Sequence, residues 1–386
     1  MSSTSMYVPT LEINENDITN LIGLIYKHQR LLKEFGAIKI QLGSKCKLAL
    51  KKRRKRLFTH PITTQVVQMS KDDLIYSVRE AALLDDSIEQ SPPIKDAAAF
   101  WLSVSCLNKQ KRHLNISLSP NKSYFDTKTS GSYFDIHRLP GLSLLKIGGK
   151  EVTEQCVPSI KIAHGPGSIL PLSCARQHLF SIDYHHEGGA HHWYIIPSSQ
   201  RDLLQSIINK QNSSSCLDHG QILIDPLMLD RYHIRYHRVI QRPNEFVVLS
   251  CGTLAQSFTE DASSSESIDF ALPSWIEEGH ANNSMSSCRH GCFHDEIDQI
   301  LSRTAPSGSV SDEYQSSEDI TASTYTYEDF LNSDDVNCSR VAFEEFMGLL
   351  SPTDIFSDSI FSQIDTHINT LKFEHIIKIS SSSFGL

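Results

Sequence analysis

Residues 179–197 read LFSIDYHHEGGAHHWYIIP, and this stretch decides how the rest of the chain is interpreted. It contains a β-type run, a glycine-containing turn and a second β-type run that ends at Pro197. Four histidines lie in or beside the turn: His185, His186, His191 and His192. Histidines bind metal ions, so the register of this stretch decides between a metal site and a set of polar turn residues.

The composition indicates a soluble protein. The chain has 386 residues, 39% of them hydrophobic, and a formal net charge of −9, which suits one large domain or two ordinary ones. Its nine cysteines are scattered, and residues 1–5 do not resemble a signal peptide, so we expect a reducing, intracellular compartment. No apolar run approaches the roughly 20 residues of a membrane span, and no membrane partner is expected.

Short β-type runs separated by turn residues dominate the chain from residue 133 to residue 280. They are residues 142–147, 159–163, 177–184, 192–196, 221–224, 246–250 and 267–272. One helix is expected among them, at residues 198–209, with Ser198 as its N-cap. Because closure of the strands removes exposed sheet edges, the pattern predicts a mainly β fold with flanking helices, built as a barrel or jelly roll.

Residues 1–41 predict a compact strand-helix-strand unit. Apolar residues recur at helical spacing from Asp17, the expected N-cap, to Glu34. Gly36 then ends the helix, and residues 37–40 form a short strand.

A basic run follows at residues 42–56, where Lys and Arg are uninterrupted from Lys51 to Arg56. Like charges repel one another and resist burial, so the run is solvated. It suits a nuclear-import receptor or a nucleic-acid backbone, and a merely solvated loop is the alternative. We expect a nuclear address, with weak DNA contact as a by-product. The next segment is interpreted as a mixed helical linker region: residues 57–132, with helical patterns at residues 72–84 and 94–107.

Motifs spread over residues 133–280 resemble those of a JmjC domain in order and spacing. They are Ser181-Ile182-Asp183-Tyr184, His186, Gly188, Trp193-Tyr194, Pro197, Ile224-x-Pro226, Gln241, Glu245-Phe246 and Phe270-Ala271-x-Pro273-x-Trp275-Ile276. Residues 1–41 are similar to a JmjN segment through Tyr7, Pro9, Thr10, Glu12, Phe35, Gly36, Lys39 and Ile40. The resemblance implies a double-stranded β-helix, a jelly-roll relative, in a family of iron(II), 2-oxoglutarate oxygenases that hydroxylate N-methyl groups on histone lysines.

The resemblance also implies where the iron ligands should lie. The family uses two histidines and a carboxylate, which leaves positions open for 2-oxoglutarate and oxygen. Counted from the motifs above, the three positions fall on Ser173, Ala175 and Ala255. Serine is a poor ligand for iron(II) and alanine is none, so we expect a degenerate site without catalytic residues.

The co-substrate positions that the resemblance implies are Tyr133, Asp183 and His191. Asp183 replaces an asparagine and would repel the 2-oxoglutarate dianion, while His191 replaces the lysine that pairs with the distal carboxylate. A partly protonated His191 could still meet an anion near pH 6.5. We therefore expect iron(II) and 2-oxoglutarate to be absent or weakly bound.

Two other metal sites are considered. The first is a substitute triad, whose residue types would match if His185 and Glu187 were joined by His233 or His237. The register speaks against it, since it places residues 185–192 at a strand end and an exposed turn. The resemblance also implies a structural zinc site in which residues 281–303 take part. Its candidate ligands are Cys216, His219, Cys288 and Cys292, with His290 and His294 in reserve. Both cysteine spacings depart from the family, so free cysteines are the alternative.

Residues 304–386 form an acidic, serine-rich tail. Residues 304–339 contain no Lys or Arg and few apolar residues, which predicts that the tail is largely disordered. Residues 327–331 and 343–350 interleave aromatic and acidic residues, as in activation segments that fold on a partner. A short helix that packs back on the domain is the alternative.

Three functions are consistent with the sequence. The first is a nuclear, chromatin-associated transcriptional regulator, a pseudo-oxygenase that acts as a binding module for histone tails or chromatin. The second is an active iron(II), 2-oxoglutarate-dependent histone lysine demethylase with atypical metal ligands. The third is a transcription adaptor whose acidic tail contacts transcription-machinery proteins, with the barrel as a platform.

Overall fold

A computed structural model describes residues 6–46, 48–51, 62–69, 74–80, 94, 96–105, 112–126, 134–210 and 216–280. All of them belong to the first of two units, Met1–His290. The acidic tail, residues 281–303 and the basic run beyond Lys51 lie outside the described residues.

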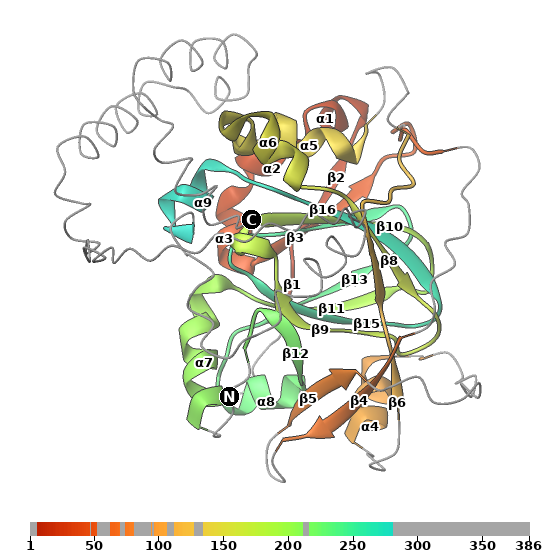
Figure 1. The fold of residues 1–386 in the computed structure, drawn as a ribbon, viewed down its shortest axis with the longest axis vertical. Helices are drawn as coiled ribbons and strands as arrows, with labels where there is room; N and C mark the ends of the chain where they lie inside the picture. The colour runs from red at the N-terminus through yellow and green to blue at the C-terminus, as the bar shows by residue number, and fades with distance from the viewer. Residues whose placement is uncertain are drawn as a thin grey trace, which may run out of the picture. The chain divides into compact units, whose positions relative to one another are not determined.

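The described strands form two sheets that face each other (Figure 1). The first sheet runs in the order β1 (Met6–Tyr7), β13 (His237–Gln241), β11 (His191–Ile196), β15 (Leu254–Thr259), β9 (Ile169–Cys174), β12 (His219–Ile224), β5 (Ile75–Glu80), β4 (Ile62–Gln68) and β6 (Arg112–Asn115). The second runs in the order β2 (Thr10–Ile13), β3 (Ala37–Leu42), β14 (Glu245–Leu249), β10 (Phe180–Gly188), β16 (Ser263–Phe270), β8 (Ser159–Ala163) and β7 (Ser117–Pro120). The expected mainly β, jelly-roll architecture with flanking helices is confirmed.

Strand β11 shows how the first sheet contributes to two cores. Trp193 and Ile195 pack between the two sheets, in a cluster with Val247 of β14. Tyr194 and Ile196 pack on the opposite face, in a second cluster that includes residues of three helices: α4 (Ala97–Ser105), α7 (Arg201–Lys210) and α8 (Pro226–Arg231). Because successive strand side chains point to opposite faces, a strand buried on both sides reads as a continuous apolar run.

The N-terminal strand-helix-strand unit is present and extends the second sheet. Its helical part consists of three short helices: α1 (Glu15–Thr19), α2 (Leu21–Lys27) and α3 (Gln29–Phe35). The N-cap is Asn14 rather than Asp17, because the side chain of each residue accepts a hydrogen bond from the backbone N–H of the other. Gly36 ends α3 in the left-handed conformation, with φ of 74°, as its sequence position indicates. Strand β3 then pairs antiparallel with β14.

The segment expected to be a mixed helical linker is largely β-structure, which corrects the sequence interpretation. The helical pattern at residues 72–84 is wrong, since residues 75–80 form β5, which pairs with β12. The helix expected at residues 94–107 is confirmed as α4. Strand β6 pairs with both β4 and β9, so β9, β12, β5, β4 and β6 form a closed ring.

One run between residues 133 and 280 is not a strand. Residues 142–147 lie in a helical segment that comprises α5 (Leu139–Leu142), the 3-10 turn Leu144–Gly148 and α6 (Gly149–Gln155). The Ser143 hydroxyl group stabilises this turn, since it donates to the Pro140 carbonyl at 2.8 Å and accepts from the Leu145 N–H at 3.3 Å. These local bonds compete with a strand ladder.

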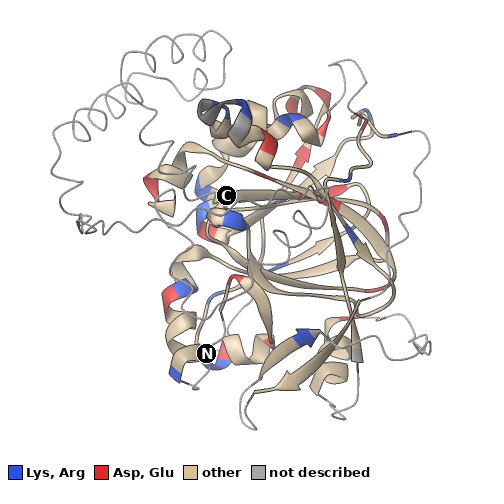
Figure 2. Ribbon diagram, in the orientation of Figure 1, with Lys and Arg blue, Asp and Glu red and all other residues tan. Residues whose placement is uncertain are grey.

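Helices cover both outer faces of the sheet pair, with α5 and α6 beyond the second sheet and α7 and α8 beyond the first (Figure 1). The ribbon of the facing strands is mostly tan in Figure 2, and charged positions gather on helices and near strand ends. In the described part of the chain, no helix is long and apolar enough to cross a membrane.

We predict that replacement of Phe100 by Ala destabilises the whole unit. Phe100 of α4 stacks on Phe258 of β15, with ring centroids 3.9 Å apart and planes 7° from parallel. Loss of a buried phenyl ring costs about 3–5 kcal/mol of unfolding free energy, which urea denaturation measures. Leu102→Ala is the matched control, because Leu102 lies on the same helix and is 64% exposed. Equal effects of the two substitutions would contradict an integral role for this segment.

Candidate functional site

The positions expected to hold iron ligands lie close together at the end of β9. Ser173 of β9 is the cross-strand partner of Ala255 of β15, and Ala175 follows β9 directly. Partners in an antiparallel ladder point to the same face, and Ala255 belongs to the cluster between the two sheets. The hydroxyl group of Ser173 and the methyl group of Ala255 therefore lie on the interior face of the barrel.

The side chains at these positions do not fit an iron(II) ion. They offer one neutral hydroxyl group and two methyl groups, whereas the facial arrangement needs two imidazoles and a carboxylate. Within the described ranges, two groups of three side chains have atoms close enough to share a metal ion, and neither includes Ser173, Ala175 or Ala255.

Asp183 makes a buried ion pair inside the barrel. The Nζ atom of Lys161, on β8, lies 2.9 Å from Oδ2 of Asp183, on β10, and the two side chains are 14% and 3% exposed. Gln241 donates from Nε2 to Oδ1 at 3.1 Å, and Ser265 donates from its hydroxyl group to Oδ2 at 3.2 Å. Burial acts to raise the pKa of Asp183, but the charge and hydrogen bond of Lys161 and the hydrogen bond from Gln241 hold it below its ordinary value.

Lys161 is the interior residue that sequence reasoning missed. Its ammonium group lies 5.5 Å from the centre of the Trp193 ring, so it contacts both sheets. The signal was present in the sequence as a lysine inside the apolar run Ser159–Ala163. Asp183 was expected to repel an incoming anion. The ammonium group of Lys161 opposes that repulsion, but it is already paired with Asp183.

His191 differs from the sequence expectation in its charge. Burial, and then the nearby His185, lower the pKa of His191 to about 3, and its Nε2 shares a 2.7 Å hydrogen bond with the Ser263 hydroxyl group. His191 is therefore neutral near pH 6.5, where partial protonation was expected. A neutral imidazole does not replace the lysine that pairs with a distal carboxylate.

The four histidines around the glycine turn are strand residues, three of them buried and His192 partly buried, so their assignment to an exposed turn is wrong. Strand β10 continues through His185 and His186 to Gly188, where the chain reverses. The rings of His185 and His191 lie 4.5 Å apart, whereas His186 pairs at 3.2 Å with Glu266. His192 pairs at 2.8 Å with Glu260. The four histidines therefore have different partners and do not converge on one point.

The alternative triad built on His185 is not assembled. His185 is 0% exposed and contacts the Gln241 carbonyl, while Glu187 and His233 are exposed. His237 is buried on β13 and packs against the Phe35 ring at 4.9 Å. These side chains do not form a metal-ligating group in the described structure.

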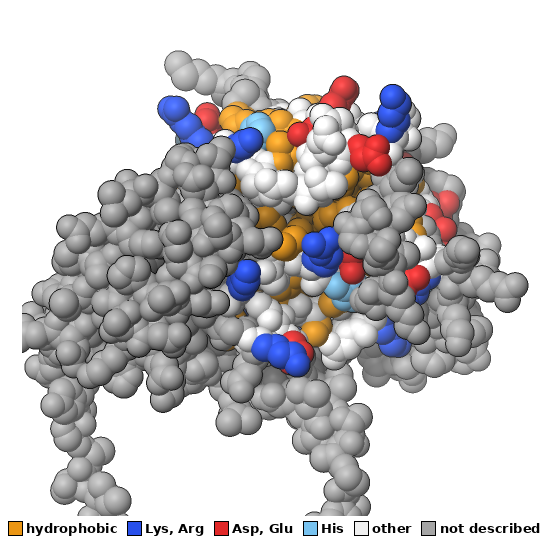
Figure 3. All heavy atoms as spheres, turned by 90° about the horizontal axis from the view of Figure 1, so that it is seen from above, with side chains coloured by type: hydrophobic (Ala, Val, Ile, Leu, Met, Phe, Trp, Pro, Cys, Tyr) orange, Lys and Arg blue, Asp and Glu red, His pale blue; other side chains and the backbone are white. Residues whose placement is uncertain are grey.

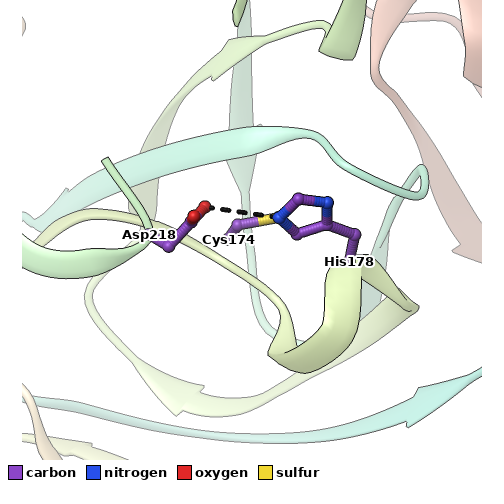
Figure 4. A group of neighbouring side chains, drawn as sticks. All are labelled: Cys174, His178 and Asp218. Carbon is purple, nitrogen blue, oxygen red and sulfur yellow. Dashed lines mark ion pairs between the residues drawn. The ribbon is translucent and has the colours of Figure 1, made fainter. Parts of the chain in front are cut away.

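Cys174, His178 and Asp218 converge on the other side of β9 (Figure 4). His178, in the 3-10 turn Arg176–His178, lies 3.7 Å from an oxygen of Asp218. Arg201 of α7 binds both carboxylate oxygens at 2.5 Å. Burial acts to raise the pKa of Asp218, but His178 and Arg201 lower it to about 2. A guanidinium group therefore already neutralises this carboxylate.

Two of the four expected zinc ligands, Cys216 and His219, are neighbours in the structure. The Nδ1 atom of His219 lies 2.9 Å from the Cys216 sulfur, and His219 pairs with Ser173 across the strands. Cys288, Cys292 and the co-substrate position Tyr133 lie outside the described residues. The five cysteines of the described part form no disulfide bonds with one another: Cys46, Cys156, Cys174, Cys216 and Cys251.

Comparison with known proteins agrees with this architecture. The family model described as "JmjC domain, hydroxylase" matches residues 163–270. The chain is 28% identical over 178 residues to Multicopy suppressor of chk1 protein 1 of Schizosaccharomyces pombe. The aligned residues make up 43% of this chain and 11% of that protein. It is 30% identical over 121 residues to Protein Jumonji of Gallus gallus, covering 29% and 10% of the two chains. Over 107 residues it is 32% identical to Probable lysine-specific demethylase 4F of Homo sapiens, covering 26% and 17%.

The chain thus spans between 10% and 17% of the length of these curated relatives. The region of likeness contains β9 to β16, which contribute to both facing sheets. Residues 163–270 therefore form a JmjC domain.

Proposed function

We propose that this chain is a chromatin-associated transcriptional regulator whose JmjC barrel binds a partner and does not turn over 2-oxoglutarate. The observation that carries the proposal is the pairing of Ser173 with Ala255 on the interior face of the barrel. At the place where the family resemblance expects iron ligands, these side chains offer neither an imidazole nor a carboxylate.

The charges inside the barrel support the same proposal. A 2-oxoglutarate dianion near Asp183 would have to compete with a carboxylate for Lys161, whose bond to Asp183 is 2.9 Å long. Removal of one partner from a buried ion pair leaves an uncompensated charge and destabilises a fold by about 3–5 kcal/mol. Lys161 and Asp183 are thus already paired with each other, and a ligand anion would have to break that pair.

The proposed partner and location are supported by the relatives and by the basic and acidic segments of the sequence. One relative is named a lysine-specific demethylase, so we propose a histone tail or another chromatin component as the partner. We also propose nuclear import through residues 51–56, with weak DNA contact there, and contact of the acidic tail with transcription-machinery proteins. On the described part of the face in Figure 3, cationic and anionic side chains are mixed among hydrophobic ones, which favours a protein partner over a nucleic acid.

A structural zinc ion is part of the proposal. The proximity of Cys216 and His219 supports the proposal: their 2.9 Å hydrogen bond would give way to a shared ion as the two atoms separate to about 3.5 Å, with Cys288 and Cys292 as the other ligands. Three thiolates and one imidazole make a closed tetrahedral site, which stabilises a fold without catalysis.

We predict that the purified chain forms no succinate above a protein-free blank when supplied with iron(II), 2-oxoglutarate and methylated histone peptides. Mouse lysine-specific demethylase 4B, a relative 30% identical over 107 residues, serves as the positive control. Succinate formation together with one tightly bound iron per chain would refute the proposal and favour an active demethylase with atypical ligands.

Restoration of the ligands should create a metal site. We expect a chain with Ser173→His, Ala175→Glu and Ala255→His to bind one more Mn²⁺ ion than the parent, because two imidazoles and one carboxylate then share the barrel end. Electron paramagnetic resonance of free Mn²⁺ measures the difference. Ala255→His alone is the control and should add no tight site. Equal binding by both variants would mean that the register of these positions is wrong.

We predict a pH dependence of stability that comes from His191. Its folded pKa of about 3 lies below the ordinary value, so the unfolded chain binds a proton that the folded chain excludes. The stabilisation is complete above about pH 6.5 and falls by about 1.4 kcal/mol per pH unit as pH decreases toward about 3. Between pH 6.5 and pH 5, urea unfolding should therefore show a loss of stability that is about 2 kcal/mol larger in the parent than in His191→Gln.

The control for this experiment is His233→Asn, which changes an exposed histidine in a left-handed conformation that asparagine tolerates. It should keep the pH dependence of the parent. A parent-like slope in His191→Gln would show that His191 is charged in the folded barrel, and would reopen anion binding at this position.

A further inference from the structure

Cys251, Glu278 and His280 converge at an edge of the barrel that the family resemblance does not assign. Cys251 lies in the turn between β14 and β15, and the other two residues follow α9 (Pro273–Glu277). The Oε2 atom of Glu278 lies 3.8 Å from the Cys251 sulfur and 3.7 Å from Nε2 of His280. One ligand atom from each side chain lies within 4.8 Å of the other two.

These separations suit a tetrahedral ion. With metal–sulfur bonds of about 2.3 Å and metal–nitrogen or metal–oxygen bonds of about 2.0 Å, neighbouring ligand atoms of a zinc ion lie about 3.3–3.6 Å apart. The distances from Glu278 exceed this range by a few tenths of an ångström. Small side-chain rotations would close the site around an ion.

His280 is the side chain that most needs a partner. Its imidazole is 12% exposed, and neither ring nitrogen has a hydrogen-bond partner in the described structure. A buried polar group without a partner destabilises a fold by about 1–3 kcal/mol, and a metal ion at Nε2 would remove that penalty. The 3.7 Å separation from Glu278 is too long for a hydrogen bond but leaves room for an ion between the two.

The backbone of the turn makes room for this ring. Gly252 has φ of +66°, and a Cβ atom there would lie 2.5 Å from Cε1 of His280. The Cys251-Gly252 pair thus supplies both a sulfur ligand and the space in which the imidazole approaches it.

The charge of this group also favours a metal more than the Cys174 group does. Arg201 occupies both oxygens of Asp218, whereas Lys33 takes Oε1 of Glu278 at 3.2 Å and leaves Oε2 facing the sulfur and the imidazole. The Lys33 side chain is 66% exposed, so it can swing into solvent when an ion binds.

We propose that Cys251, Glu278 and His280 bind a zinc ion whose fourth position is open to water. A thiolate and a carboxylate neutralise the two charges of the ion, and the thiolate and imidazole select zinc over magnesium or calcium. The ion connects the β14–β15 turn to the segment after α9. This site shares no ligand with the Cys216–His219 pair and is independent of the proposed function.

Metal binding at this site releases a proton. Burial, and then the charge of Glu278, raise the pKa of the Cys251 thiol to about 12, so the thiol is protonated without metal. Zinc replaces that proton to form the zinc–sulfur bond, and the proton passes to solvent. Affinity should therefore fall as the pH is lowered.

The test counts zinc ions in the full chain. Protein stripped with a chelator is titrated with zinc in competition with a chromophoric chelator, and Co²⁺ replaces zinc in a parallel titration to report thiolate ligation through its charge-transfer absorption. We expect Cys251→Ser and His280→Gln each to bind one zinc fewer than the parent. Cys156→Ser is the matched control, because Cys156 is a buried thiol outside both ligand groups, and it should bind as the parent does.

Two further variants separate the possible outcomes. Cys216→Ser should lose a different equivalent, so that its loss adds to that of His280→Gln in the double variant. If Cys251→Ser fails to fold, His280→Gln decides, since its side chain lies at the edge of the core. A zinc count and cobalt spectrum in folded His280→Gln identical to those of the parent would overturn the proposal.

Discussion

The structure depends on central strands that are buried on both faces. In β11, Trp193 and Ile195 pack between the sheets, while Tyr194 and Ile196 pack under the helices. The same division applies to β15, where Ala255 faces inward and Leu254 and Phe258 face outward. Since a slip of one residue would exchange the two faces of a strand, this double burial strongly specifies the register. The register in turn puts Ser173 beside Ala255.

Inside this frame, Lys161, Asp183 and Gln241 form a bonded polar network. Lys161 and Asp183 come from the second sheet and Gln241 from the first, so their bonds cross the space between the sheets. Gln241 also accepts a 2.9 Å hydrogen bond from the Trp193 indole. A network of this kind rigidifies a core when it is fully satisfied. The interior thus has the character of a structural polar core, in agreement with a binding module that presents its outer surface to partners.

Local sequence patterns correctly predicted strands that contain a clear apolar run of their own, such as β8 and β11. They failed for β5, which is a strand because it pairs with β12. They also failed for residues 142–147, where the Ser143 hydroxyl group stabilises a helical turn. The positions of Ser173 and Ala255 were counted from motifs, and the structure shows that these two residues pair across β9 and β15. The charge state of His191 could not be predicted from the sequence, since it depends on burial by distant strands. Cys251 and His280 were missed because a turn and a helix end, far apart in sequence, bring them together.

The position of β16 in the second sheet has a consequence for how the protein is made. This strand is the last in the described chain, yet it lies between β10 and β8 and pairs with both. Until the ribosome has released residues 263–270, β8 and β10 each lack a neighbour on one side, and the edges of the nascent sheet stay exposed. Closure of the second sheet therefore waits for residues 263–270 and depends on contacts between residues that are distant in the sequence, which slows folding.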